Sequence, residues 1–181
     1  RRMTPPAEDL YANAAWADAR PRLSVLVPYK GDNPCALLRA LGREALPAEL
    51  VLLDDGSGDA ALDAEVIVTL SELALPARRV RLTANEGRAK GRNRLVRHAR
   101  ADRLLFLDAD MLPDSPIFLA AWIALIEVED PAVAFGGFSL VQAPAPPVAF
   151  PIFALKATEI LYFKPPMLEK APSFRLIIWL C

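Results

Sequence analysis

The chain has 181 residues, enough for one domain with a sizeable hydrophobic core. Hydrophobic residues make up 54% of it and charged residues 24%, a composition that is typical of folded globular proteins and excludes a disordered chain. The formal net charge of −1 gives no sign of a surface built for nucleic acid. We therefore expect no nucleic-acid partner.

Apolar runs in the sequence are too short to cross a membrane. No stretch approaches the roughly 20 consecutive apolar residues of a membrane-spanning helix, and residues 1–21 lack the apolar centre of a secretion signal. The two cysteines, Cys35 and Cys181, lack the spacing of a zinc site. We expect a cytoplasmic protein without a transmembrane segment, whose membrane contacts, if any, are peripheral.

Short β-rich runs alternate with longer helical patterns between residues 22 and 142. The expected strands are residues 23–28, 49–55, 78–83, 103–110 and 132–140, and the expected helices are residues 34–46, 59–75, 87–100 and 115–129. Strands that alternate with helices of this length form a mostly parallel, twisted sheet with helices on both faces. We predict an α/β domain over residues 22–142.

Two flanking segments depart from this pattern. Residues 1–21 are predicted to form an N-terminal arm, with a short helix within residues 7–18. Residues 143–181 are rich in proline and poor in charge, and the alternation of strands and helices stops there. We expect an atypical proline-rich tail or a truncated acceptor-binding region, which would leave the fold incomplete at its C-terminus.

Polar motifs follow three of the expected strands. These motifs are PYKGD (residues 28–32), DDGSGD (residues 54–59) and DAD (residues 108–110). In parallel α/β sheets, ligands bind outside the carboxyl ends of the strands. We therefore expect the functional site at the sheet edge where these three motifs meet.

The segment LLFLDADML (residues 104–112) ends an apolar strand in two acids, and three interpretations are open. Asp108 and Asp110 can both approach one divalent cation, which can then bridge to phosphate oxygens. Alternatively, Asp108 merely ends a strand and Asp110 is a turn residue. A third interpretation is a phosphatase of the haloacid dehalogenase type, with Asp108 as its nucleophile.

The segment VLLDDGSGD (residues 51–59) is a second apolar strand that closes in paired acids. Asp54 or Asp55 can accept hydrogen bonds from the base or sugar of a nucleotide. Alternatively, the segment is a turn between a strand and a helix, in which Asp54, Ser57 and Asp59 satisfy backbone donors. The sequence alone leaves both interpretations open.

The segment NEGRAKGRNR (residues 85–94) combines small residues with cations at the start of a helix. The small residues Gly87, Ala89 and Gly91 allow close approach to a neighbour or ligand, and Arg88, Lys90 and Arg92 supply positive charge. A helix N-terminus with nearby cations suits a diphosphate. The alternative is a solvated basic face, which is the usual meaning of such a run.

In this order and at these separations, the four motifs resemble the nucleotide-binding half of family 2 glycosyltransferases of the GT-A fold. The resemblance covers about Leu23 to Leu140. It implies transfer of a sugar from a nucleoside-diphosphate sugar, such as a UDP-sugar, to a hydroxyl of a glycan, lipid or protein acceptor, with inversion. It also implies a Mn²⁺ or Mg²⁺ cofactor.

The resemblance assigns roles to individual positions. Pro28 and Tyr29 match the loop that borders the nucleotide base, and Asp55 matches an acid that contacts the base. Asn85 and Gly87 match the start of an Asn-x-Gly motif. Arg92 and Asn93 match the Arg-Asn end of that motif. Asp108 matches the acid that faces the donor ribose or metal, and Asp110 matches the direct metal ligand.

Three features depart from the family pattern. After Pro28 and Tyr29, the run KGD (residues 30–32) replaces the Asn or Glu that the family often has there. Gly91 stands where the family commonly has alanine. In the family the general base is an Asp or Glu in the acceptor-binding region, but residues after Gln142 contain no such acidic motif. We therefore expect a donor-binding half with the catalytic base unassigned. A non-catalytic module that binds a nucleotide-sugar or a metal is the second alternative, and the phosphatase is the third.

Overall fold

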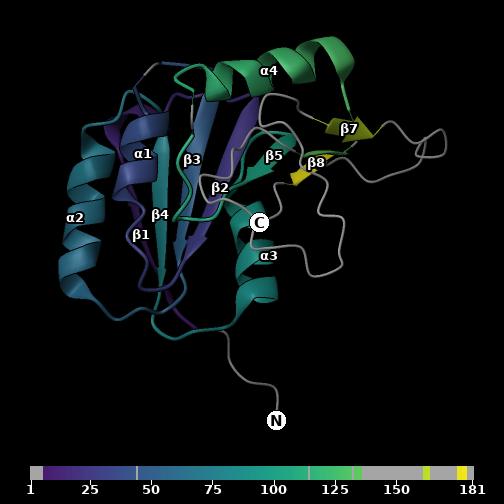
Figure 1. Ribbon diagram of the computed structural model, residues 1–181. Coiled ribbons are helices and arrows are strands. Elements are labelled where there is room, and N and C mark those ends of the chain that lie inside the picture. Colours follow the sequence, from purple (N-terminus) through teal and green to yellow (C-terminus); the bar gives the residue numbers. More distant parts are fainter. Residues whose placement is uncertain are drawn as a thin grey trace, which may run out of the picture.

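The structure is a computed structural model that describes residues 6–43, 45–113, 115–131, 133–135, 161–163 and 175–178, the last three segments by their backbone alone. One mixed sheet forms its centre (Figure 1). Its strands, in spatial order, are β1 (Glu8–Ala12), β4 (Ala77–Leu82), β3 (Ala48–Asp54), β2 (Leu23–Tyr29), β5 (Arg103–Phe106) and β8 (Arg175–Ile178). β1 pairs antiparallel with β4, and the other pairs are parallel.

Helices cover both faces of this sheet, as the alternating pattern predicts. Helices α1 (Cys35–Leu41), α2 (Ala60–Ser71) and α4 (Phe118–Glu129) pack on one face, and α3 (Arg88–His98) packs on the other (Figure 1). Because side chains alternate along a strand, Val25 and Val27 of β2 join the first hydrophobic cluster and Leu26 joins the second. Burial on both faces explains why β2, β3 and β5 are mainly apolar, whereas β4 carries three arginines.

The segment assigned to an N-terminal arm contributes to the sheet. Residues 8–12 form the antiparallel edge strand β1, and a 3-10 helix, η1 (Ala14–Trp16), replaces the longer helix expected there. Asn13 fastens this segment to the domain: its side-chain amide donates to the Leu70 and Leu75 carbonyls, and its oxygen accepts from the Ala77 N–H. A polar edge strand lacks the apolar pattern that the other strands show, so its sequence signal is weak.

The strand expected at residues 132–140 does not join the main sheet. Within it, β6 (Val133–Phe135) pairs antiparallel with β7 (Leu161–Phe163) in a separate two-stranded sheet, and residues 136–140 lie outside the described residues. The position beside β5 is taken by β8, which pairs with it in parallel register from Arg103 with Arg175 to Phe106 with Ile178. A strand pattern predicts extended backbone but does not specify the partner strand.

The described part of the chain contains no helix that is long and apolar enough to cross a bilayer.

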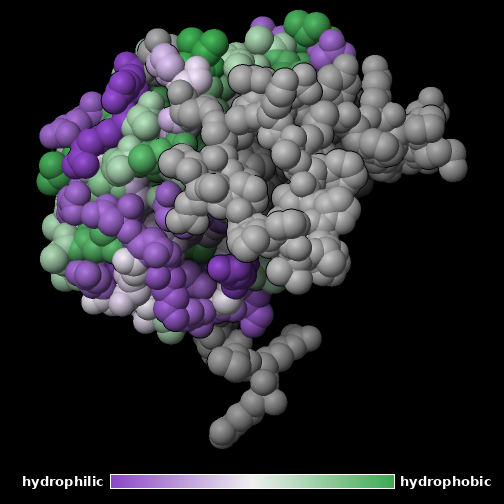
Figure 2. Space-filling view, in the orientation of Figure 1, coloured by the Kyte–Doolittle hydropathy of each residue, from purple (hydrophilic) through white to green (hydrophobic). Residues whose placement is uncertain are grey.

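The parallel strands of the main sheet end together at the lower edge of Figure 1, next to the start of α3. The described surface in this lower region is mainly hydrophilic (Figure 2). The polar motifs therefore meet at one edge of the sheet.

Candidate functional site

A pocket of about 560 Å³ opens at the carboxyl ends of β2, β3 and β5. The pocket is lined by every residue predicted to bind the donor or a metal: Pro28, Tyr29, Asp55, Asn85, Gly87, Arg92, Asp108 and Asp110. These residues come from four separate segments, and only the fold brings them together. The sheet edge named from the sequence is therefore the edge that carries this pocket.

The end of β2 forms one wall. Pro28 lies beyond the last β2–β5 register pair, Leu26 with Phe106, so its missing N–H interrupts no bond of that ladder. The Tyr29 side chain is only 4% exposed and packs in the core. Burial, followed by the charge of Asp54, raises the Tyr29 pKa, so the phenol stays neutral. Tyr29 contributes mainly by its carbonyl, which accepts from the Asp55 N–H at 2.9 Å.

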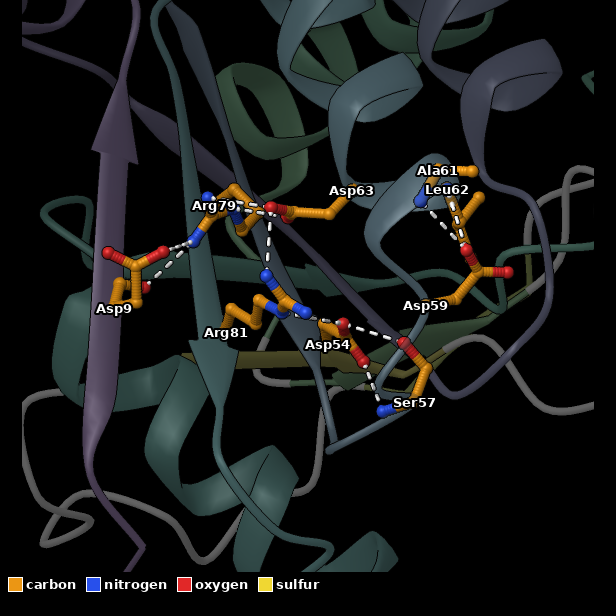
Figure 3. Close-up of polar contacts among 9 residues, drawn as sticks. All are labelled: Asp9, Asp54, Ser57, Asp59, Ala61, Leu62, Asp63, Arg79 and Arg81. Atoms are coloured by element: carbon orange, nitrogen blue, oxygen red, sulfur yellow. Dashed lines mark hydrogen bonds and ion pairs between the residues drawn. The ribbon is translucent and has the colours of Figure 1, made fainter.

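Asp54 has the turn role that the sequence analysis left open. Its Oδ1 accepts from the Ser57 N–H at 2.8 Å, and its Oδ2 accepts from the Ser57 hydroxyl at 2.7 Å (Figure 3). Asp59 caps α2, because its Oδ1 accepts from the N–H groups of Ala61 and Leu62. The motif DDGSGD therefore builds its own turn and begins the next helix.

Asp55 joins two motifs that are distant in sequence. Its Oδ1 accepts from the Glu86 N–H at 2.8 Å and its Oδ2 from the Gly87 N–H at 3.0 Å. Its side chain is buried but still lines the pocket. A carboxylate can accept further hydrogen bonds beyond these two, so Asp55 can fix the loop before α3 and remain an acceptor for a ligand.

Two glycines allow these loops to lie so close. Gly56 has φ +72°, and a Cβ atom there would lie 2.5 Å from the Asn85 nitrogen. Gly87 precedes the first residue of α3 and has φ +91°. No side chain caps this helix, so its first N–H groups face the pocket region unsatisfied by a cap. Glycine is the residue that both backbone conformations require.

The Asp-x-Asp motif forms a turn after β5. The Met111 N–H donates to the Asp108 carbonyl at 3.2 Å, which closes a turn over residues 108–111. Asp108 Oδ1 lies 3.3 Å from Arg92 Nη2, and each side chain is 38% exposed. Asp110 is exposed and forms no hydrogen bond or ion pair with another described residue. The pocket thus presents one paired carboxylate and one available carboxylate.

Gly91, the departure from the family pattern, packs against the sheet. A Cβ atom there would lie 2.9 Å from the Leu53 Cδ2 atom and 4.0 Å from Asp55 Oδ2. The missing side chain lets α3 approach the end of β3 at the pocket floor. Leu53 also lines the pocket, so glycine at position 91 leaves room for this leucine.

Three further charged residues line the pocket although the family pattern gives them no role: Lys30, Asp32 and Arg88. Lys30 and Asp32 belong to the PYKGD motif, whose place at the strand edge was the available signal. Arg88 is the first residue of α3. Together with Arg92, the two additional cations balance much of the negative charge of the carboxylates.

A network of charges behind the pocket links the edge strand to the DDGSGD turn (Figure 3). Asp9 of β1 accepts from Arg79 at 2.7 Å, and Arg79 also pairs with Asp63 of α2 at 3.0 Å. Arg81 bridges Asp63, at 3.2 Å, and Asp54, at 3.8 Å. The position of Asp54 therefore depends on β4 and α2 as well as on its own turn.

The family model described as Glycosyl transferase family 2 matches residues 24–170. The chain belongs to glycosyl transferase family 2. The match includes all four motifs and every residue that lines the pocket. It lends no support to the phosphatase alternative.

Several solved structures, one of them a mannosyltransferase, share the fold of this family 2 chain. A mannosyltransferase from Pyrobaculum calidifontis in complex with GDP-Man and Mn²⁺ is 25% identical, with a TM-score of 0.54 over 68% of this chain and 37% of that chain. S. aureus TarS 1–349 is 23% identical, with a TM-score of 0.55 over 70% and 38% of the respective chains. The prediction of a GT-A type, mostly parallel α/β fold is confirmed.

A second structure of S. aureus TarS is 25% identical, with a TM-score of 0.56 over 70% of this chain and 23% of that chain. The family 2 chain thus spans well under half the length of each of these three chains. No curated protein matches the chain significantly in sequence.

Proposed function

We propose that this chain binds a nucleoside-diphosphate sugar in the pocket at the strand ends and serves the transfer of its sugar to an acceptor hydroxyl. One observation carries the proposal: the eight positions that the family pattern assigns to the donor site line a single pocket, although they come from four segments. An unrelated Asp-x-Asp turn would have no reason to share a pocket with the other three motifs.

The carboxylates of Asp108 and Asp110 fit a Mn²⁺ or Mg²⁺ ion. Both are hard oxygen ligands on one turn, and Asp110 is available. The described residues contain no group of three or more potential metal ligands, which suits an ion that keeps water molecules and takes phosphate oxygens as its other ligands. When bound, such an ion stabilises the charge that develops on the leaving diphosphate.

Positive groups are placed for the diphosphate. The uncapped start of α3 presents backbone N–H groups, and Arg88 and Lys30 line the same pocket. Arg92 is held near by Asp108 at 3.3 Å. Phosphate oxygens accept hydrogen bonds from all of these donors, so they attract a diphosphate independently of the metal.

The nucleotide base and the acceptor hydroxyl need different groups of the protein. Pro28 and Asp55 border the part of the pocket that we assign to the nucleotide base, where the remaining lone pairs of Asp55 can accept from a base N–H. Transfer with inversion requires a general base that takes the proton of the acceptor hydroxyl. Among the described residues we identify no such general base, so the catalytic step needs an acceptor-binding region beyond the pocket.

An activity assay tests the proposal. The chain is incubated with UDP- and GDP-hexoses with and without Mn²⁺. Binding of the nucleotide-sugar is measured by calorimetry, and release of the nucleoside diphosphate is followed with and without simple glycan acceptors. Metal-dependent release supports a transferase. Metal-dependent binding without release supports the non-catalytic module, and the absence of both binding and release contradicts the proposal.

A further inference from the structure

We infer that Arg94 is a positioning residue of the donor pocket, which acts through Glu86 to hold the loop of residues 85–87 and is itself fixed by Glu8 of the edge strand. This inference rests on the proposed function, because it concerns the same pocket. Arg94 does not line the pocket, and its side chain donates hydrogen bonds to Glu86 and Glu8 rather than to an assigned donor residue.

The contact between Arg94 and Glu86 is bidentate and buried. Arg94 Nε lies 2.5 Å from Glu86 Oε1 and Nη2 lies 2.6 Å from Oε2, and the two side chains are only 7% and 8% exposed. The third nitrogen of the guanidinium, Nη1, donates to Glu8. A planar guanidinium with all three nitrogens engaged fixes the orientation of the Glu86 side chain as a lysine cannot.

Glu86 is therefore held at both ends. The backbone N–H groups of Glu86 and Gly87 donate to the carboxylate of Asp55. The Glu86 side chain accepts hydrogen bonds from Arg94. Asn85 and Gly87, on either side of Glu86, both line the pocket. The wall of the pocket between β4 and α3 is thus clamped from the sheet by Asp55 and from α3 by Arg94.

The charges around this clamp balance. The hydrogen bond from Arg94 lowers the pKa of Glu86, with smaller contributions from Arg97 and Lys90. Glu8 also contacts His98 at 3.1 Å, so the edge strand binds α3 at two places. Removing the Arg94 charge would leave Glu86 buried without its partner, and the loop would have to move to hydrate it.

Arg94 and the neighbouring Arg92 have different roles although both belong to α3. Arg92 reaches the pocket and pairs with Asp108, whereas Arg94 turns to the opposite side toward Glu86 and Glu8. Residues two apart on a helix do not share a face, which explains this division. The sequence run of cations therefore contains two arginines that line the pocket, Arg88 and Arg92, and one supporting arginine, Arg94.

The test compares Arg94→Gln, Arg94→Lys, Glu86→Gln and the double variant Arg94→Gln with Glu86→Gln. Arg97→Gln is the control, because Arg97 is an exposed arginine on the same helix that acts on Glu86 only through its charge, without a hydrogen bond or ion pair. Two quantities are measured: hydrogen exchange of the amides of residues 85–87 in the free protein, and the affinity for GDP and UDP with Mn²⁺. Urea denaturation checks that each variant is folded at the assay temperature.

We expect faster exchange at residues 85–87 and roughly tenfold weaker binding in Arg94→Gln, with a smaller loss in Arg94→Lys and none in the control. Because Arg94 acts through Glu86, the double variant should bind no more weakly than Glu86→Gln alone. Exchange and affinity equal to those of Arg97→Gln, or losses that simply add in the double variant, would overturn the inference.

The two proposals fail in different ways. If the unaltered chain binds neither GDP nor UDP, the donor-site proposal fails, and hydrogen exchange still decides whether Arg94 holds the loop. If the unaltered chain binds and Arg94→Gln binds equally well, the donor site stands and the positioning role of Arg94 fails.

Discussion

Asp54 and Asp55 show how neighbouring identical residues acquire different roles. Asp54 binds Ser57 within its own turn, whereas Asp55 binds the backbone of Glu86 and Gly87. The turn role of Asp54 follows from local spacing and was among the alternatives drawn from the sequence. The role of Asp55 depends on a loop that follows another strand, so local spacing gives no indication of it.

Asp55→Asn tests the clamp at the level of one residue. The amide nitrogen of asparagine would face one of the two backbone N–H donors, so we expect a loss of roughly 1–3 kcal/mol in the free energy of unfolding. Urea denaturation measures this loss in the free energy of unfolding. The exposed pocket residue Asp32, changed to asparagine, serves as the control and should lose little. Equal stability of the two variants would contradict the clamp.

Gly91 permits a second test, of packing between α3 and β3. Gly91→Ala improves helix propensity but brings a methyl group toward Leu53, so we expect the free energy of unfolding to change by less than about 1 kcal/mol. Gly91→Val adds branched volume at the same contact and should lose about 1–3 kcal/mol. A valine variant as stable as the unaltered chain would show that α3 is not closely packed there.

At the scale of elements, the buried charges between β1, β4 and α2 decide where the DDGSGD turn lies. Arg79 is 3% exposed and depends on Asp63 and Asp9 for neutralisation. Asp9 is on an edge strand and largely exposed, so Asp63 is the principal buried partner. This network couples helix α2 to the strand that ends beside the pocket.

Asp63→Ala should therefore destabilise the fold strongly. It leaves Arg79 with one exposed partner, and breaking such a buried pair costs roughly 3 kcal/mol or more. Asp59→Ala, at the cap of the same helix, should cost only about 1 kcal/mol. Thermal or urea denaturation of the two variants compares them. A larger loss from the cap than from Asp63 would contradict this ranking.

The elements also show what a sequence pattern can and cannot predict. Strands β2, β3, β4 and β5 and all four helices were predicted, because apolar periodicity is a local property that burial enforces. β1 and β8 were missed, since an edge strand is polar and the pairing of β8 with β5 spans a long stretch of chain. Strand pairing between distant segments is decided by the whole fold.

At the scale of the molecule, the fold assembles the site. The eight positions assigned to the donor site were selected from motifs, but the roles of the supporting arginines were not: Arg79 and Arg81 belong to no motif, Arg94 only ends the segment NEGRAKGRNR, and their contacts alone identify them. Lys30, Asp32 and Arg88 belong to motifs, but the family pattern gives them no role. Ligand-facing residues leave a pattern in the sequence, whereas their supports depend on three-dimensional contacts.

Acid should weaken the whole molecule through the ion pairs of β1 and α3. Hydrogen bonds from arginine lower the pKa of Glu86 and Asp9, and for Glu8 the pairing with Arg94 and His98 outweighs the opposing effect of burial. Because the folded pKa lies below the ordinary value, the stabilisation is present above that value and is lost as pH falls through the folded pKa.

We therefore expect the free energy of unfolding to fall as pH drops below 4.5, the ordinary value for Glu8 and Glu86. Burial lowers the pKa of His98 against the opposing charge of Glu8, so its protonation below 6.5 acts in the same direction. Denaturation at a series of pH values measures the slope. Arg94→Gln should show a shallower decline, and an identical decline would contradict the assigned pairs.

The central claim is that the pocket binds a nucleoside diphosphate together with a divalent cation. Isothermal titration calorimetry with UDP, GDP and CDP, with and without Mn²⁺, tests it directly in the unaltered chain, in Asp110→Asn and in Asp59→Asn. Asp59→Asn removes the same charge while asparagine still caps α2. We expect Mn²⁺-dependent binding that Asp110→Asn weakens at least about tenfold and Asp59→Asn leaves unchanged. Binding that is indifferent to both Mn²⁺ and Asp110, or no binding of any of the three nucleotides, would contradict the claim.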